Sequence, residues 1–400
     1  MRRTRRRGQA PGDRPERAPR QLLLVTFVST LDRFAMAPML VAMARDLGTP
    51  LSAMVHAASA YFLAYGLTQP LWGMIADRFG LVRTMRTALV LAATATAVAA
   101  TLGSAPGLAI ARGLAGACFS AAIPACLVYV GDTVPAPRRQ PQITNLMTGA
   151  ALGTALASAG AGALAQYTSW RLVFAITGAA ALLLAASLGR VPEPPLLRAN
   201  ASVLAPVAAV ARSRPTLMVL GLAFVEGMVV LGALTLLPAA VEATGASGSV
   251  AGAVTAAYGI AVLGGARLAG KAAQRVHTSR LIAFGAVSAT AACALTALSR
   301  APELALPAAA LLGLAWVSMH SSLQTWATEV LPCARATVIA GFAMALFLGS
   351  ALAAVLAGGY AEAGRYAEIF AMAAALAVPL GLAATVGRTR WTRPEGEHGR

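Results

Sequence analysis

Long runs of apolar residues alternate along this chain with short polar junctions. A helix needs roughly 20 mainly apolar residues to cross the hydrocarbon core of a bilayer. Stretches of this kind begin near Leu22, Met54, Thr84, Gly107, Ile143, Leu172, Thr216, Val250, Leu281, Leu304, Ala336 and Glu368. The pattern therefore predicts an all-α polytopic membrane protein with twelve transmembrane helices.

The composition agrees with a surface that lies mostly in lipid. Hydrophobic residues make up 58% of the sequence and charged residues only 12%. A soluble globular protein normally carries about a quarter charged residues, so this chain has too few to cover a surface that faces water. The pattern also lacks the ten-residue alternating strands of a membrane barrel, which leaves helices as the way to satisfy the backbone in lipid.

The basic residues are concentrated on one predicted side of the membrane. Of the 32 Lys and Arg residues, 26 fall in the two tails or in the junctions after predicted helices 2, 4, 6, 8 and 10. The positive-inside rule then places both termini in the cytoplasm, for a protein of the inner (cytoplasmic) cell membrane. Orientation and attraction to anionic lipids explain the net charge of +17, so nucleic-acid binding is not expected. Residues 1–20, which contain no apolar core, are interpreted as a cytoplasmic tail.

The two halves of the chain match each other at a fixed offset of 197 residues. The paired positions are Tyr61 and Tyr258, Gly73 and Gly270, Arg78 and Arg275, Arg83 and Arg280, Asp132 and Glu329, Pro135 and Pro332, Arg138 and Arg335, and Gly162 and Gly359. Two homologous six-helix bundles are therefore predicted, over residues 21–190 and 215–388. The Pro- and Arg-rich stretch 191–214 is interpreted as a cytoplasmic linker, and 389–400 as a cytoplasmic tail.

The most specific motif lies between the second and third predicted helices. Its residues are Gly73, Asp77, Arg78, Gly80 and Arg83. They resemble the loop signature Gly-x-x-x-Asp-Arg-x-Gly-x-x-Arg of major facilitator transporters, whose two parallel halves surround a substrate site near the midplane of the membrane. The resemblance implies alternating access, with this loop and its partner Asp132 acting as a conformational latch that stabilises the outward-facing state.

Three ionisable residues inside the predicted spans are candidates for proton coupling. Asp32 and Glu226 lie one in each bundle, and intramembrane acids are functional candidates because a charge in lipid is costly. Arg112 lies in a segment that resembles the arginine motif of the same family, in which the arginine is implicated in proton coupling. A static ion pair that holds helices together is the alternative role for the two acids.

The direction of transport is less sharply indicated. Asp32 and Arg33, followed by Pro38, resemble the first-helix pattern of proton-driven drug exporters. Predicted helix 5 resembles the glycine-rich antiporter motif only in part, because Thr154 stands where its proline belongs. The same fold and carboxylate chemistry also support import. Proton-coupled import of a sugar, an organic acid or another metabolite therefore stays open.

Polar and amphipathic side chains within the spans are candidates for the wall of a substrate cavity, because such groups need a partner or a ligand when buried. The candidates are Tyr61, Tyr65, Gln69, Tyr129, Asn145, Tyr258, Trp316, His320 and Gln324. Substrate identity cannot be deduced from them, because a cavity of this kind is assembled from many helices.

The function predicted first is proton-coupled efflux of small organic molecules, either drug-like compounds or metabolites, by alternating access. A membrane sensor or scaffold without transport is a further alternative. The sequence has no nucleophile–base pair, phosphate loop or metal-ligand spacing, so no catalytic residues, cofactor or metal are expected. The expected partners are a small-molecule substrate, protons and the lipid bilayer, and the chain is expected to be a monomer.

Overall fold

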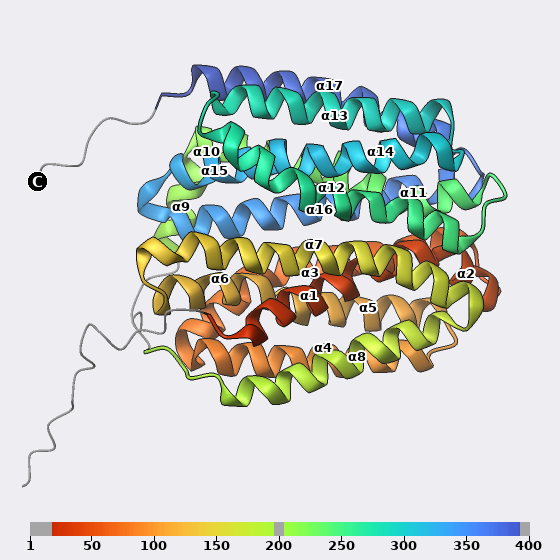
Figure 1. Cartoon of the computed structure of the whole chain (residues 1–400), viewed down its shortest axis with the longest axis horizontal. Helices are drawn as coiled ribbons and strands as arrows, with labels where there is room; N and C mark the ends of the chain where they lie inside the picture. Colours follow the sequence, from red (N-terminus) through yellow and green to blue (C-terminus); the bar gives the residue numbers. More distant parts are fainter. Residues whose placement is uncertain (1–17, 196–203, 393–400) are drawn as a thin grey trace, which may run out of the picture.

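The computed structural model describes residues 18–195 and 204–392, which are almost entirely helical (Figure 1). The helices of the first half are α1 (Arg20–Ala35), η1 (Ala37–Met39), α2 (Leu40–Asp46), α3 (Leu51–Phe79), α4 (Leu81–Thr101), α5 (Ala105–Phe119), α6 (Ala122–Thr133), α7 (Ala136–Tyr167), α8 (Trp170–Ser187) and η2 (Leu188–Arg190). Most of the predicted tail over residues 1–20 lies outside the described residues, as do 196–203 of the linker and 393–400 of the second tail.

The second half repeats this succession of long helices. Its elements are α9 (Leu204–Arg212), α10 (Arg214–Glu226), η3 (Gly227–Leu231), α11 (Gly232–Glu242), α12 (Gly248–Ala273), α13 (Thr278–Leu298), α14 (Pro302–Ala315), η4 (Trp316–His320), α15 (Ser321–Glu329), η5 (Pro332–Ala334), α16 (Arg335–Glu362) and α17 (Tyr366–Arg390). Several elements join end to end, so that α1–η1–α2, α5–α6, α10–η3–α11 and α14–η4–α15 each form one long rod.

Twelve rods are long enough to cross a bilayer. Within the described ranges, eleven also have the apolar composition of a membrane span. The twelfth is α3, whose lower hydropathy follows from polar side chains such as His56, Gln69 and Asp77. The prediction of twelve transmembrane helices is thereby confirmed.

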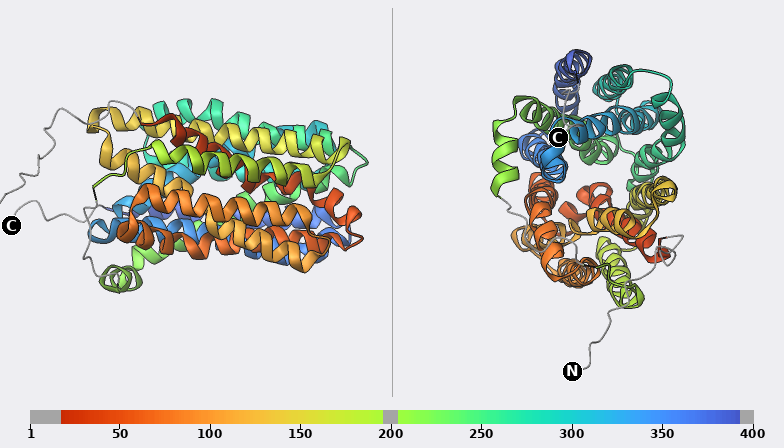
Figure 2. Two further views of the ribbon diagram at one scale, coloured as in Figure 1. Left: turned by 90° about the horizontal axis from the view of Figure 1, so that it is seen from below. Right: turned by 90° about the vertical axis from the view of Figure 1, so that its left-hand side faces the viewer.

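The rods form two bundles that correspond to the two halves of the sequence (Figures 1 and 2). In the first bundle α1 packs on α7, α3 on α5, and α4 on α8. In the second, α12 packs on α14, α13 on α17, and α10 on α16. The bundles meet chiefly along two helix pairs, α7 with α12 and α3 with α16.

Small residues allow the backbones of the two bundles to approach closely, as is usual for helices in membranes. A Cβ atom added at Gly162 of α7 would lie 2.5 Å from the carbonyl oxygen of Gly248 in α12. One added at Gly259 would lie 2.7 Å from the backbone nitrogen of Ala155. Glycines at these positions therefore fix how tightly α7 and α12 pack.

At one end of the interface, which we call the closed end, two equivalent hydrogen bonds join the bundles. The backbone N–H of Ser52, in the first turn of α3, donates to the carboxylate of Glu362 at 2.9 Å. The N–H of Ser249, in the first turn of α12, donates to the side-chain oxygen of Gln166 at 2.7 Å. First-turn N–H groups have no partner within their own helix, so each bundle caps a helix of the other. Ser52 and Ser249 are 197 residues apart, which is the repeat offset.

Candidate functional site

Asp32 of α1 and Arg112 of α5 form an ion pair in the interior of the first bundle. Arg112 Nη2 lies 2.9 Å from Asp32 Oδ2, and Nη1 lies 3.2 Å from Oδ1. Nη2 also donates to the backbone carbonyl of Asp32 at 3.2 Å. Both side chains have zero exposed surface. This is a bidentate, charge-assisted contact, the strongest geometry that the two groups can adopt.

Two further helices complete the surroundings of the pair. The hydroxyl groups of Thr96 in α4 and Thr177 in α8 lie 3.4 and 3.2 Å from Asp32 Oδ1. The guanidinium carbon of Arg112 lies 4.7 Å from the ring centroid of Tyr61 and 4.6 Å from that of Phe174. Asp32 belongs to α1, and its carboxylate therefore contacts residues of three other helices, α4, α5 and α8. Removing one partner from such a pair costs about 3–5 kcal/mol, because the other charge stays buried.

The second bundle contains its own buried acid. Glu226 ends α10, and its Oε2 atom lies 3.2 Å from Nδ1 of His320. The other carboxylate oxygen, Oε1, is buried without a hydrogen-bond partner among the described residues. The imidazole of His320 stacks on the ring of Trp316, with ring centroids 3.7 Å apart. The ring centroid of Phe342 lies 5.5 Å from that of His320. The structure thus brings together Glu226, Trp316 and His320, which the sequence singled out separately.

Both members of this pair border a π-helical turn. Glu226 directly precedes the turn Gly227–Leu231, and His320 is the last residue of the turn Trp316–His320. Such turns insert one residue into the helix and are frequent at functional sites. The carboxylate and imidazole therefore lie where their helices are least regular.

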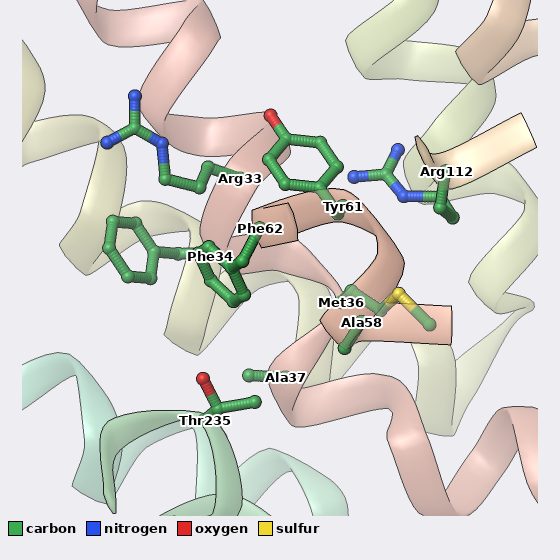
Figure 3. Close-up of a pocket in the computed structure, with 9 residues that line it drawn as sticks. All are labelled: Arg33, Phe34, Met36, Ala37, Ala58, Tyr61, Phe62, Arg112 and Thr235. Atoms are coloured by element: carbon green, nitrogen blue, oxygen red, sulfur yellow. The ribbon is translucent and has the colours of Figure 1, made fainter. Parts of the chain in front are cut away.

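A small pocket lies between the bundles near the first ion pair, with room for about one water molecule. Its wall includes Arg33 and Phe34 of α1, Tyr61 of α3, Arg112 of α5 and, from the second bundle, Thr235 of α11. Figure 3 shows Tyr61 between the two arginines and Thr235 on the opposite helix. The hydroxyl oxygen of Tyr61 is buried and has no partner among the described residues.

Arg33 is a polar residue of this region that the sequence did not assign. Its guanidinium group donates to the hydroxyl of Tyr65. The guanidinium carbon lies 4.3 Å from the Tyr65 ring centroid and 5.2 Å from that of Phe347 in α16. Arg33 therefore contacts both bundles, while the adjacent Asp32 faces the interior of its own.

The remaining cavity candidates are dispersed. Tyr258 is buried, and its ring centroid lies 6.5 Å from that of Phe34. Gln69 is partly buried. Asn145 and Gln324 are exposed. Tyr129 donates its hydroxyl to the carbonyl of Pro192 at 3.2 Å, which ties it to the start of the linker rather than to the pocket.

The loop motif lies at the end of the molecule opposite the closed contacts (Figure 1). Gly73, Asp77, Arg78, Arg83 and Asp132 are all exposed there. Among the ion pairs of the described residues, none joins Asp132 to Arg78 or Arg83. The contact with Asp132 that the motif predicts is therefore not formed among the described residues, and the role of the motif as a latch stays a prediction.

The start of α4, next to Gly80 of the motif, is capped by an acid that the sequence did not single out. The carboxylate of Glu193 accepts hydrogen bonds from the backbone N–H groups of Val82 and Arg83, at 2.9 and 3.0 Å. Gly80 has a φ of +102°, and a Cβ atom there would lie 2.9 Å from the Glu193 carboxyl carbon. Glycine at this position therefore allows the positive φ angle and leaves room for the Glu193 carboxylate beside the backbone.

The Glu193 contact gives a stability prediction. We expect Glu193→Gln to lower the free energy of unfolding by about 1 kcal/mol, the usual effect of a weakened helix cap. Glu303→Gln is the matched control, because Glu303 is an exposed acid in the first turn of α14 with no hydrogen bond among those described. Thermal unfolding of the purified proteins in detergent measures both. Equal losses in the two variants would mean that the Glu193 contact contributes nothing of its own.

The second bundle has a different charged cluster at the same end. Arg388 Nη1 lies 2.9 Å from Glu329 Oε2, and both side chains are largely buried. The guanidinium carbon of Arg388 lies 5.7 Å from the ring centroid of Trp326 and 4.9 Å from that of Trp391. Glu329 is the repeat counterpart of Asp132, so the duplicated position is exposed in one half and paired in the other.

The sequence profile of the Major Facilitator Superfamily matches residues 22–332, which is more than half of the chain. The chain belongs to the Major Facilitator Superfamily. As a member of this superfamily, the protein is a secondary transporter and not an enzyme.

Three solved structures of the Major Facilitator fold illustrate the likeness. The nucleoside transporter NupG superposes with a TM-score of 0.75 at 15% identity, over 93% of this chain and 99% of that chain. The xylose transporter XylE from E. coli, in a partially occluded inward-open conformation, gives 0.71 at 17%, over 94% and 98%. A bacterial homologue of the lysosomal transporter Spinster, inward-facing and unoccupied, gives 0.69 at 18%, over 93% and 98%. At these identities the likeness concerns the fold alone.

A curated relative is more similar over a shorter stretch. The hexuronate transporter of Escherichia coli (strain K12) is 33% identical over 121 residues, which cover 30% of this chain and 28% of that protein. The matched stretch is thus less than a third of the relative's length.

Proposed function

We propose that this transporter couples the movement of a small organic molecule to protons, with Asp32 as the proton-carrying group and Arg112 as its partner. The observation that carries the proposal is the fully buried, bidentate contact between the two side chains. Protonation of Asp32 would cancel its charge and weaken its hold on Arg112, Thr96 and Thr177. Since these groups belong to four helices, proton binding would favour a different arrangement of the first bundle.

Glu226 and His320 are the second centre in this proposal. A carboxylate with one free oxygen and an imidazole with two ring nitrogens offer a place where a proton or a polar substrate group can bind. Their position in the other bundle would let each half respond separately as the bundles move.

The proposed orientation places both termini and the loop motif in the cytoplasm of a cell with an inner membrane. The closed end, with the caps on Ser52 and Ser249, would then face outward, and the structure would represent an inward-facing monomer. In this orientation, the missing contact between Asp132 and the motif fits an inward-facing state, since the family's loop stabilises the outward-facing state. Asp132 would approach Arg78 and Arg83 only when the cytoplasmic end closes.

Two directions of transport are candidates. Export by proton antiport is favoured by the pattern Asp32, Arg33 and Pro38 in the first helix. Import by proton symport is favoured by Thr154 in place of the antiporter proline and by the short similarity to the hexuronate transporter. The buried ion pair is compatible with both directions.

Reconstitution into vesicles with an imposed pH difference tests coupling and direction together. An antiporter accumulates its substrate when the vesicle lumen is acidic, whereas a symporter accumulates it when the outer solution is acidic. We expect one polarity to drive accumulation for at least one compound of a panel of organic acids, sugars and amphipathic cations. A protonophore should abolish it, and transport that is insensitive to the protonophore would refute proton coupling.

A further inference from the structure

Arg33 is a half-buried arginine with unused hydrogen-bonding capacity among the described residues. A guanidinium group has five N–H donors and no acceptor. In the described part of the chain, the one hydrogen bond that Arg33 makes through its side chain is to the Tyr65 hydroxyl. Its Nε atom is buried without a partner. None of the ion pairs of the described residues includes Arg33.

The two arginines on the pocket wall differ in their partners. Arg112 also lines it, but Asp32 neutralises Arg112 through two hydrogen bonds. No acid is among the nine lining residues. Arg33 therefore presents to the pocket a positive charge with no carboxylate in contact with it among the described residues, and in surroundings of low dielectric an anion would be attracted to it.

The groups beside Arg33 suit an anion that is attached to an apolar or ring-shaped body. The Tyr61 hydroxyl, unpartnered and fully buried, is a further donor on the same wall. Phe34 and Phe62 also line the pocket, and the ring of Phe347 lies 4.4 Å from that of Tyr65. Because Phe347 belongs to the second bundle, a ligand bound here would touch both halves.

We propose that Arg33 binds the carboxylate of an organic monoanion, whose ring or apolar body packs among the aromatic side chains of α1, α3 and α16. The inference rests on the proposed transport function and specifies the substrate class of that site. A planar guanidinium group matches a carboxylate through two parallel hydrogen bonds. One guanidinium group without a contacting carboxylate matches a monoanion, whereas a phosphate dianion would leave a negative charge unpaired. The pocket must widen to admit the ligand, which requires the bundles to separate.

Thermal unfolding of the purified full-length protein with paired probes tests the proposal. The probes are glucuronate and benzoate, each compared with its uncharged amide, glucuronamide or benzamide, at equal ionic strength. We expect the acids, and not the amides, to raise the melting temperature of the wild type. Arg33→Gln should remove this increase, and Arg33→Lys should weaken the apparent affinity by roughly tenfold or more, since lysine cannot make the bidentate contact.

Arg212→Gln is the matched control, because Arg212 is an exposed arginine of α9, remote from the pocket. It should keep the full response to the acids. The proposal is overturned if no acid stabilises the wild type, if acid and amide act equally, or if Arg33→Gln responds as the wild type does. Loss of the response to acids, with proton-driven accumulation of an uncharged or cationic compound retained, would overturn this inference alone, so it and the proposed proton coupling fail separately.

Discussion

Asp32→Asn is expected to reduce proton-driven accumulation of substrate by roughly tenfold or more, to the level seen with a protonophore. The amide keeps the shape of the carboxyl group and can still accept a hydrogen bond from Arg112, but it cannot carry a proton. Exchange of labelled for unlabelled substrate between solutions of equal pH should continue, because no net proton movement is needed. Vesicles that contain the purified variant measure both activities.

The Asp32→Asn variant also leaves the charge of Arg112 without its counterion. Loss of one partner from a buried pair costs about 3–5 kcal/mol. Size-exclusion chromatography must therefore show that the variant is folded before its transport is compared with that of the wild type. The double variant Asp32→Asn with Arg112→Gln removes both charges and should regain stability while staying uncoupled. Asp32→Glu keeps the ionisable group and should retain part of the coupling. Unchanged proton-driven transport in folded Asp32→Asn would reduce the pair to a structural contact.

Gly349→Ala is expected to destabilise the second bundle by about 1–3 kcal/mol or more, the usual cost of overpacking. A Cβ atom at Gly349 of α16 would overlap the backbone carbonyl oxygen of Phe224 in α10 and lie 3.2 Å from the nitrogen of Met228. Both contacts are with backbone, so rotation of a side chain cannot relieve them. Thermal unfolding in detergent measures the loss.

Gly359→Ala in the same helix provides the control for Gly349→Ala. A Cβ atom at Gly359 meets no other atom within 4 Å. Alanine should be neutral or stabilising there by up to about 1 kcal/mol, because it favours the helix more than glycine does. Similar melting temperatures for the two variants would show that α10 and α16 can separate without loss. Because Glu226 ends α10 beside this crossing, the Gly349 variant should also displace the carboxylate relative to His320.

The helices and the two halves of this fold could be predicted from the sequence, because each depends on a local or periodic pattern. Apolar runs mark the spans, and the offset of 197 residues marks the duplication. The pairing of α3 with α16 and of α7 with α12 could not be predicted. It depends on glycines such as Gly66 and Gly162 that pack against the facing helix, and an alanine-rich chain offers many equivalent faces.

The charged centres could be identified one by one but not assembled. Asp32 and Arg112 stood out because charges are rare in membrane spans, yet Thr96 and Thr177 look like ordinary span residues until the fold brings them to Asp32. Arg33 was noticed only as the neighbour of Asp32. Its contacts come from α3 and α16, which are remote in the sequence.

The contacts around the loop motif were the least predictable. The signature directed attention to Asp132, whereas the structure places the carboxylate of Glu193 on the start of α4. Glu193 follows a proline in a linker of biased composition, and nothing in the sequence distinguishes it from a solvent-exposed acid. The motif indicates a local backbone geometry, and it does not indicate which side chain from outside the motif binds there.

The two helix caps at the closed end are related by the repeat of the sequence. Ser52 and Ser249 occupy the same place in the repeat, and their acceptors Glu362 and Gln166 lie within one residue of equivalent positions. The relation is that of an isologous interface, in which residue i touches j and j touches i. A separate six-helix unit would make the same pair of contacts with a second copy of itself. The interface of the fused protein therefore has the geometry of a twofold homodimer within a single polypeptide.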